Sequence, residues 1–236
     1  MTVEIRHCAA LELVKSLEDQ SVDAIVTDPP SGISFMGKDW DNQSTYEPST
    51  AKGRTALEVC KALDLKRWEV GFVAFIVDHF AAAIPKLKPG AHCLVWALPR
   101  TADLTGLGLR ISGLEIRDVC VHLFGSGFPK SLDVSKAIDK AAGAEREAVG
   151  KQAARVGFDP NGQGGGGWSA GAVKHTKPST PEAQRWQGYG TALKPGSEHW
   201  ILARRPVEGT IARCVLEHGT GALNVDACRV ASNGDH

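Results

Sequence analysis

The stretch 22-VDAIVTDPPSGISFMGKDWD-41 carries an apolar run straight into an acid, two prolines and a serine. Its opening segment, 22-VDAIVT-27, is too apolar and β-branched for a half-exposed strand, which predicts a strand of a parallel sheet covered on both faces. Asp28 is the first residue past the carboxyl end of that strand. In doubly wound α/β folds, ligands bind outside the carboxyl ends of the strands. Asp28 is therefore the first candidate functional residue.

The rest of the chain alternates between strand-like and helix-like patterns. Strands are predicted at residues 2–7, 22–27, 91–98, 114–124 and 199–206, and helices at 10–17, 70–87, 101–113, 132–143 and 207–219. Residues 31–55 are polar and irregular, which predicts a long loop. The 114–124 strand alternates more than the others and favours an edge position or an antiparallel pair. This rhythm predicts an α/β fold with a mainly parallel, doubly wound sheet.

The overall composition narrows the function classes. The 236 residues fit one large domain, or one domain with an insertion. The 27 basic and 27 acidic residues cancel, so there is no global positive field of the kind that marks a nucleic-acid coat protein, although a nucleic-acid enzyme needs only local positive charge. No apolar run approaches the ~20 residues of a membrane span, and Glu4 stands where a signal peptide would be apolar. We therefore expect a cytoplasmic protein with no membrane partner.

The six cysteines are scattered and form no C-x-x-C pair. Only Cys214 and His218 have a spacing that stacks two metal ligands on one helical face. Because a second such pair is missing, structural thiols are favoured over a zinc site, and no metal is predicted.

The composition changes between about residues 144 and 190, where 164-GGGG-167 stands among many polar residues and few aliphatic ones. This predicts a flexible glycine-rich insertion at 144–190, between a catalytic α/β part at 1–143 and a return to the α/β core at 191–236. Basic residues interleaved with aromatic ones suit a loop that orders on DNA, whereas a solvated linker is the alternative.

The chemistry of Asp28-Pro29-Pro30 is that of rigid acceptors. Each proline fixes its own φ and restricts the residue before it, and neither offers an N–H group. The backbone therefore presents carbonyls and a carboxylate without competing donors, which suits a ligand group that donates hydrogen bonds, such as an exocyclic amine. Taken alone, the motif favours a simple strand-ending turn, since Asp-Pro commonly opens loops.

The surroundings of the motif reverse that preference. The run 21-SVDAIVTDPPSGISFMGKDWD-41 resembles the catalytic motif of amino-group DNA methyltransferases, which is Asp-Pro-Pro-Tyr at the end of a buried strand. The resemblance extends through 10-ALELVKSL-17 ahead of it, and through residues 124–140 and 188–206 beyond it, which look like blocks of phage and prophage members. It covers most of the chain and implies a methyltransferase-like, Rossmann-like sheet.

The resemblance also implies a reaction and a partner. The enzyme would take a base out of double-stranded DNA and transfer a methyl group from S-adenosylmethionine to its exocyclic amine, with adenine N6 favoured over cytosine N4 by the Asp form of the motif. Asp28, Pro29, Pro30 and Ser31 would form the catalytic segment, and Asp28 and Pro29 would also touch the cofactor. The expected DNA contacts are Phe35, Lys130, Lys174, Lys177 and Arg185.

Three features depart from the family pattern. Ser31 stands where the family has an aromatic residue that stacks on the flipped base, an interaction of ~1–3 kcal/mol in single-strand binding, and Phe35 and Trp40 are nearby aromatics that could compensate. Ala9 replaces an acid associated with the cofactor. The glycine-rich Phe-x-Gly-x-Gly cofactor loop does not occur before His236. We therefore expect the catalytic half of the fold, truncated or decayed, with weak cofactor binding.

Two further functions stay open at this level. One is a DNA-binding remnant that keeps the sheet without catalysis. The other is a methyltransferase acting on RNA or on a protein glutamine, whose acceptor is also an amino or amide nitrogen.

Overall fold

The computed structural model describes residues 2–34, 37–124, 131–152, 173–193 and 196–230. The chain divides into two compact units, the first formed by Met1–Gly125 and Gly196–His236 and the second by Ser126–Pro195. We expected the boundaries at 143/144 and 190/191. The first boundary lies earlier because helix α5 (Val134–Ala141), which we had placed in the catalytic part, packs against α6 (Pro181–Arg185) in the second unit.

A four-stranded sheet forms the centre of the first unit, with the strand order β1-β2-β6-β3. The strands are β1 (Val22–Thr27), β2 (Leu87–Ala97), β6 (Ser197–Arg204) and β3 (Glu115–Leu123). β1 pairs with β2 in parallel, whereas β6 pairs antiparallel with both β2 and β3. The protein is therefore α/β with a mixed sheet, and the expectation of a mainly parallel sheet was wrong for the described strands. The chain leaves β3 through the second unit and returns as β6 running the other way.

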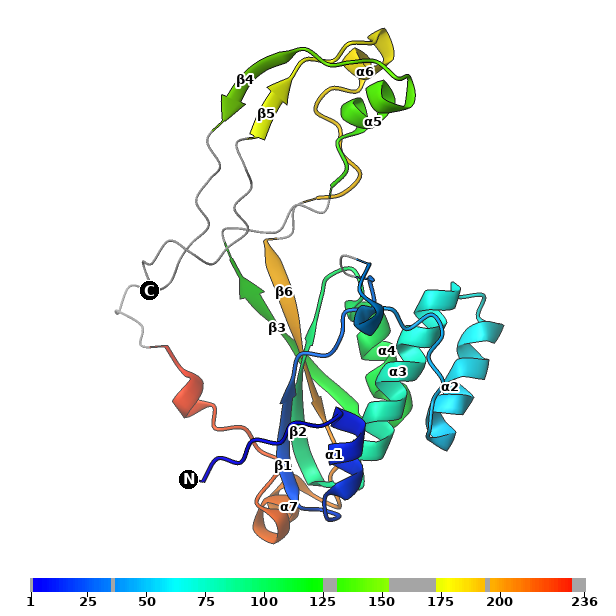
Figure 1. Ribbon diagram of the computed structural model, residues 1–236. Coiled ribbons are helices and arrows are strands. Elements are labelled where there is room, and N and C mark those ends of the chain that lie inside the picture. The colour runs from blue at the N-terminus through cyan, green and yellow to red at the C-terminus, as the bar shows by residue number, and fades with distance from the viewer. Residues whose placement is uncertain (1, 35–36, 125–130, 153–172, 194–195, 231–236) are drawn as a thin grey trace. The chain divides into compact units, whose positions relative to one another are not determined.

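Helices α1 (Ala10–Ser16), α2 (Ala51–Ala62), α3 (Arg67–Ala83) and α4 (Ala102–Ser112) lie on one side of this sheet (Figure 1). α3 is the central helix and packs against the other three. It is apolar on nearly all sides, and Phe72, Ile76 and Val77 are among its fully buried side chains. A helix of this kind needs neighbours all round, which α1, α2, α4 and the sheet supply.

The outer strands of the sheet differ in how well the sequence predicted them. β1 was expected to be buried on both faces, but it lies at an edge and the side chain of Val26 is 69% exposed. The reason is that α1 to α4 lie on one side of the sheet, so alternate residues of β1 lack cover. β3 forms the other edge and pairs antiparallel, as its alternating pattern predicted, and its Val121 and Leu123 are exposed.

Two segments near the amino terminus were predicted wrongly. Residues 2–7 form no strand and are exposed, because an alternating pattern needs a partner strand and none of the described strands pairs with them. Helix α2 begins inside the segment expected to be a loop, with the Thr50 side chain accepting a hydrogen bond from the Gly53 N–H at 3.0 Å. Gly53 weakens the helical signal, yet a Cβ there would lie 2.8 Å from the Asp78 carboxylate, so the glycine makes room for a buried acid.

The second unit contains α5 and α6 together with the antiparallel pair β4 (Ala148–Gln152) and β5 (Val173–Thr176). The described part of the predicted flexible insertion therefore holds regular elements of its own. The glycine run at 164–167 lies outside the described residues. α7 (Ile211–His218) belongs to the first unit and packs against β2.

Candidate functional site

Asp28, Pro29 and Pro30 follow β1 directly and form one end of a pocket of about 400 Å³. The walls come from α1, β1 and α3 and consist mostly of apolar side chains. The polar residues of the lining are Thr27, Asp28, His79 and Lys86. The acid therefore lies at the carboxyl end of a strand, as predicted, and it lines a largely apolar cavity.

The electrostatic state of Asp28 is shifted by this surrounding. Partial burial raises the pKa of the Asp28 carboxyl above its ordinary value, although the residue as a whole remains exposed. The two prolines that follow contribute carbonyl oxygens and no N–H donors. This end of the pocket can therefore accept hydrogen bonds from a ligand, and an amino group is the matching donor.

Aromatic side chains from α3 line the same pocket. The rings of Phe75 and His79 lie 4.2 Å apart between centroids, and Tyr46 meets Phe75 edge-on at 5.2 Å. Sequence reasoning missed Phe75 and His79 because in a buried-looking helix they have the pattern of ordinary core residues. It had considered Trp40, which is 60% exposed, and Phe35, which lies outside the described residues.

The turn after the prolines is organised by an acid that the sequence did not single out. Asp41, fully buried in the 3-10 turn η2 (Asp39–Asp41), accepts hydrogen bonds from the backbone N–H of Gly32 at 2.8 Å and of Ile33 at 3.2 Å. The Ser31 hydroxyl lies 3.3 Å from each of its carboxylate oxygens. Ser31 therefore directs its hydroxyl toward Asp41.

A second buried acid anchors the far end of the same loop. Asp78 of α3 accepts hydrogen bonds from the Tyr46 hydroxyl at 2.8 Å, the Ser49 N–H at 2.9 Å and the Thr50 N–H at 2.6 Å. Burial alone would raise the pKa of Asp78, but the hydrogen bonds from Thr50, Ser49 and Tyr46 outweigh it and lower the pKa to about 2. Burial and the bond to Asp78 raise the pKa of Tyr46. The far end of the segment expected to be an irregular loop is thus anchored to α3.

The expected DNA-contact residues belong mainly to the second unit. Lys177 and Arg185 are exposed there, and Lys174 belongs to β5, with its side chain outside the described part of the chain. Phe35 and Lys130 also lie outside the described residues. Close to Arg185 in the chain, Trp186 and Tyr189 are exposed and their rings meet edge-on at 4.9 Å.

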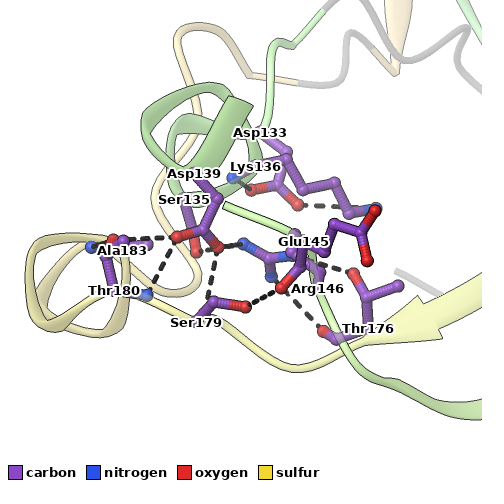
Figure 2. A network of polar contacts seen from close by, with 10 residues as sticks. All are labelled: Asp133, Ser135, Lys136, Asp139, Glu145, Arg146, Thr176, Ser179, Thr180 and Ala183. Carbon is purple, nitrogen blue, oxygen red and sulfur yellow. Dashed lines mark hydrogen bonds and ion pairs between the residues drawn. The ribbon is translucent and has the colours of Figure 1, made fainter. Parts of the chain in front are cut away.

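A buried ion pair organises the second unit (Figure 2). Asp139 of α5 is fully buried and accepts hydrogen bonds from Arg146 at 2.5 Å and from the N–H groups of Ser179 and Thr180 at 3.1 and 3.0 Å. Arg146 also donates to Thr176 and Ser135. Burial by itself raises the pKa of Asp139, but these hydrogen bonds and the charge of Arg146 lower it overall. This network joins α5, β5 and the start of α6, which explains why they form one compact unit.

The described residues contain no group of three or more His, Cys, Asp or Glu that could hold a metal ion. Cys214 is buried, and its thiol donates a hydrogen bond to the carbonyl of Pro89 at 3.1 Å. Its role in this part of the molecule is that of a small packed side chain.

Within the described ranges, no helix combines the length and the apolar character needed to cross a membrane. Comparison with protein-family models finds no family that matches this chain, and comparison with curated proteins finds no match.

Proposed function

We propose that this chain is an S-adenosylmethionine-dependent DNA methyltransferase that acts on the exocyclic amine of a flipped base, adenine N6. The observation that carries the proposal is the placement of Asp28-Pro29-Pro30, which follows a parallel strand and forms one end of a pocket of about 400 Å³. The reaction class is inferred from the motif resemblance. The pocket has apolar and aromatic side chains against which the planar ring of a flipped base could pack.

The residues of the chain have distinct roles in this proposal. The Asp28 carboxylate and the Pro29 carbonyl accept the two N–H groups of the target amine and so orient its nitrogen lone pair. The prolines keep these acceptors rigid, which reduces the reorganisation needed in the transition state. Asp28 is exposed in the free protein, so a bound base that covers it would exclude water and strengthen the hydrogen bonds to its carboxylate. The raised pKa of Asp28 is consistent with a carboxylate that is partly desolvated beside this lining.

The pocket fits only one part of the cofactor. S-adenosylmethionine supplies an electrophilic methyl group on a positively charged sulfonium, and the Asp28 carboxylate beside an apolar wall suits that charge. The ribose and adenine need several hydrogen-bond partners, but among the described residues the polar lining besides Asp28 consists of Thr27, His79 and Lys86. We therefore expect binding far weaker than micromolar, since each missing hydrogen bond costs about 1 kcal/mol.

The proposal extends to the fold and the partner. The parallel β1–α3–β2 arrangement, with an acid at the carboxyl end of β1, supports a Rossmann-like, methyltransferase-like sheet in the first unit. The exposed Lys177 and Arg185, with Trp186 and Tyr189 nearby in the chain, support DNA recognition by the second unit. Double-stranded DNA in the cytoplasm is then the partner.

The test is methyl transfer from labelled cofactor to unmethylated duplex DNA at millimolar cofactor concentration. Asp28→Ala should lower the rate by about a hundredfold or more, because it removes the oriented acceptor. Asp23→Ala is the matched control, since Asp23 is an exposed acid on the same strand, paired with Lys88 at 2.6 Å, and should leave the rate within about twofold. Activity of Asp28→Ala within tenfold of the parent would show that the assignment is wrong.

The same preparation separates the alternatives. Transfer to RNA or protein but not to duplex DNA would point to a different acceptor, and DNA binding without transfer would point to a non-catalytic remnant. A calorimetric titration with S-adenosylmethionine should give a dissociation constant well above the micromolar range. A low-micromolar value would contradict our reading of the pocket lining.

A further inference from the structure

We infer that Asp41 is the positioning residue of the Asp28-Pro29-Pro30 segment. Its carboxylate accepts hydrogen bonds from the donors of the following turn, so these donors do not bond to the Asp28 carboxylate or the Pro29 carbonyl. The catalytic meaning of this inference rests on the proposed function. The arrangement of the turn does not depend on it.

The carboxylate of Asp41 is surrounded by donors from one short turn. The N–H groups of Gly32 and Ile33 donate to its two oxygens at 2.8 and 3.2 Å, and the Ser31 hydroxyl lies 3.3 Å from both. The N–H of Ser34 donates to the Asp41 backbone carbonyl at 3.0 Å. Because Asp41 is fully buried, these bonds form where water does not compete, and bonds to a charged acceptor are among the stronger ones.

Helix α3 holds both partners of this contact in place. Gly32 has a φ of +73°, and a Cβ on it would lie 2.5 Å from the ring of Phe72. On the other side, the carbonyl oxygen of Gln43 approaches so closely that a Cβ on Gly71 would lie 1.8 Å from it. Two neighbouring residues of α3 therefore fix the turn after the prolines and the segment after Asp41. Asp41 links these two segments through its hydrogen bonds to the N–H groups of Gly32 and Ile33.

The consequence concerns which donors can reach the pocket. Asp28 and the Pro29 carbonyl serve a substrate amine only if protein donors leave them free. Without Asp41, the donors at residues 31 to 33 would form hydrogen bonds with other nearby acceptors such as these two, because a buried N–H without a partner is costly. Because Asp41 accepts hydrogen bonds from these donors, the Asp28 carboxylate and the Pro29 carbonyl remain available to a ligand.

The experiment compares Asp41→Asn with Asp39→Asn. Both changes remove one charge from the same 3-10 turn, but Asp39 is exposed. Amide hydrogen exchange is measured for Gly32 and Ile33, alongside amides of α3 and β2, and kcat and KM for duplex DNA are measured in parallel. In Asp41→Asn the Gly32 and Ile33 amides should exchange about tenfold to a hundredfold faster, because one oxygen acceptor becomes an NH2 donor. Their exchange should be unchanged in Asp39→Asn.

The kinetic arm distinguishes positioning from simple stabilisation. We expect kcat to fall about tenfold or more in Asp41→Asn while KM for DNA stays within about twofold. Exchange that accelerates equally throughout the first unit, unchanged exchange at Gly32 and Ile33, or an unchanged kcat would each overturn the inference. If the parent transfers no methyl group to DNA, the proposed function fails, while the exchange data still decide whether Asp41 holds the turn.

Gly32→Ala provides a second variant that leaves Asp41 intact. Its Cβ would clash with the ring of Phe72, and alanine is strained at the φ of +73° that the turn adopts here, so the same local acceleration at Ile33 and the same loss of kcat are expected. Should Asp41→Asn fail to fold, this variant decides the question, and unchanged exchange and kcat in it would overturn the inference.

Discussion

Asp78 shows at the scale of one residue how a buried carboxylate stabilises the loop beside the site. Its folded-state pKa of about 2 lies below the ordinary value of 3.8, because hydrogen bonds from Thr50, Ser49 and Tyr46 outweigh the effect of burial. A carboxyl whose pKa is lowered on folding contributes stability that is present above its unfolded pKa and is lost as the pH falls through its folded pKa. The relevant window is therefore from about pH 4 down to about pH 2.

We predict that Asp78→Asn lowers the free energy of unfolding at neutral pH by about 1.5–3 kcal/mol, the range for hydrogen bonds to a charged group. The loss of stability between pH 4 and pH 2 should also become shallower in this variant. Urea unfolding monitored across that pH range measures both effects. Asp19→Asn is the control, because it removes only a surface ion pair with Lys86 at 2.7 Å and should change stability by less than about 1 kcal/mol. Equal effects of the two substitutions would contradict this account.

At the scale of the element, the contact between α3 and α4 depends on a single glycine. A Cβ on Gly108 would lie 2.7 Å from Cγ2 of Ile76, whereas a Cβ on Gly106 in the same helix would have only Ile201 within reach, at 3.9 Å. Both glycines weaken the intrinsic helix propensity equally. Only Gly108 allows the two helices their close approach.

This difference predicts opposite effects for two matched substitutions. Gly106→Ala should stabilise the protein by about 0.5–1 kcal/mol through helix propensity. Gly108→Ala should destabilise it by about 1–3 kcal/mol, because the added methyl group overpacks the core against Ile76. Denaturant midpoints of the two variants provide the measurement. Stabilisation by Gly108→Ala would show that α4 can shift away from α3 without loss.

At the scale of the whole molecule, the two compact units rest on different interactions. The first has a continuous hydrophobic core around α3 and the sheet, whereas in the second the fully buried Asp139, paired with Arg146, joins segments far apart in the sequence. Breaking a buried pair leaves an uncompensated charge, and the damage should stay within the unit that contains it.

We therefore predict that Arg146→Met accelerates amide exchange at Ser179 and Thr180 by roughly tenfold or more, while the amides of β2 keep their protection. Arg185→Met, which removes an exposed cation from the same unit, should leave all of these amides unchanged. Exchange monitored residue by residue separates the two cases. Equal acceleration in β2 and at Thr180 would show that the units unfold together.

Local patterns were sufficient for part of this protein. The apolar run of β1 and the acid after it, the helices α1, α3 and α4, and the edge character of β3 could all be read from residues close together in the chain. The glycine that ends α4 is a clear case, since Gly113 has a φ of 111° that other residues rarely adopt. Such features depend on burial and turn chemistry, which neighbouring residues encode directly.

The remaining features depend on which distant segments meet. Whether a strand runs parallel depends on the path of the chain between strands, so the direction of β6 had no local signal. Asp41 carries no mark that separates it from Asp39, and it becomes part of the site only because Gly71 and Phe72 bring its segment against the turn at Gly32. A buried acid is identified by the donors around it, and for Asp41, Asp78 and Asp139 those donors are contributed by other segments of the folded chain.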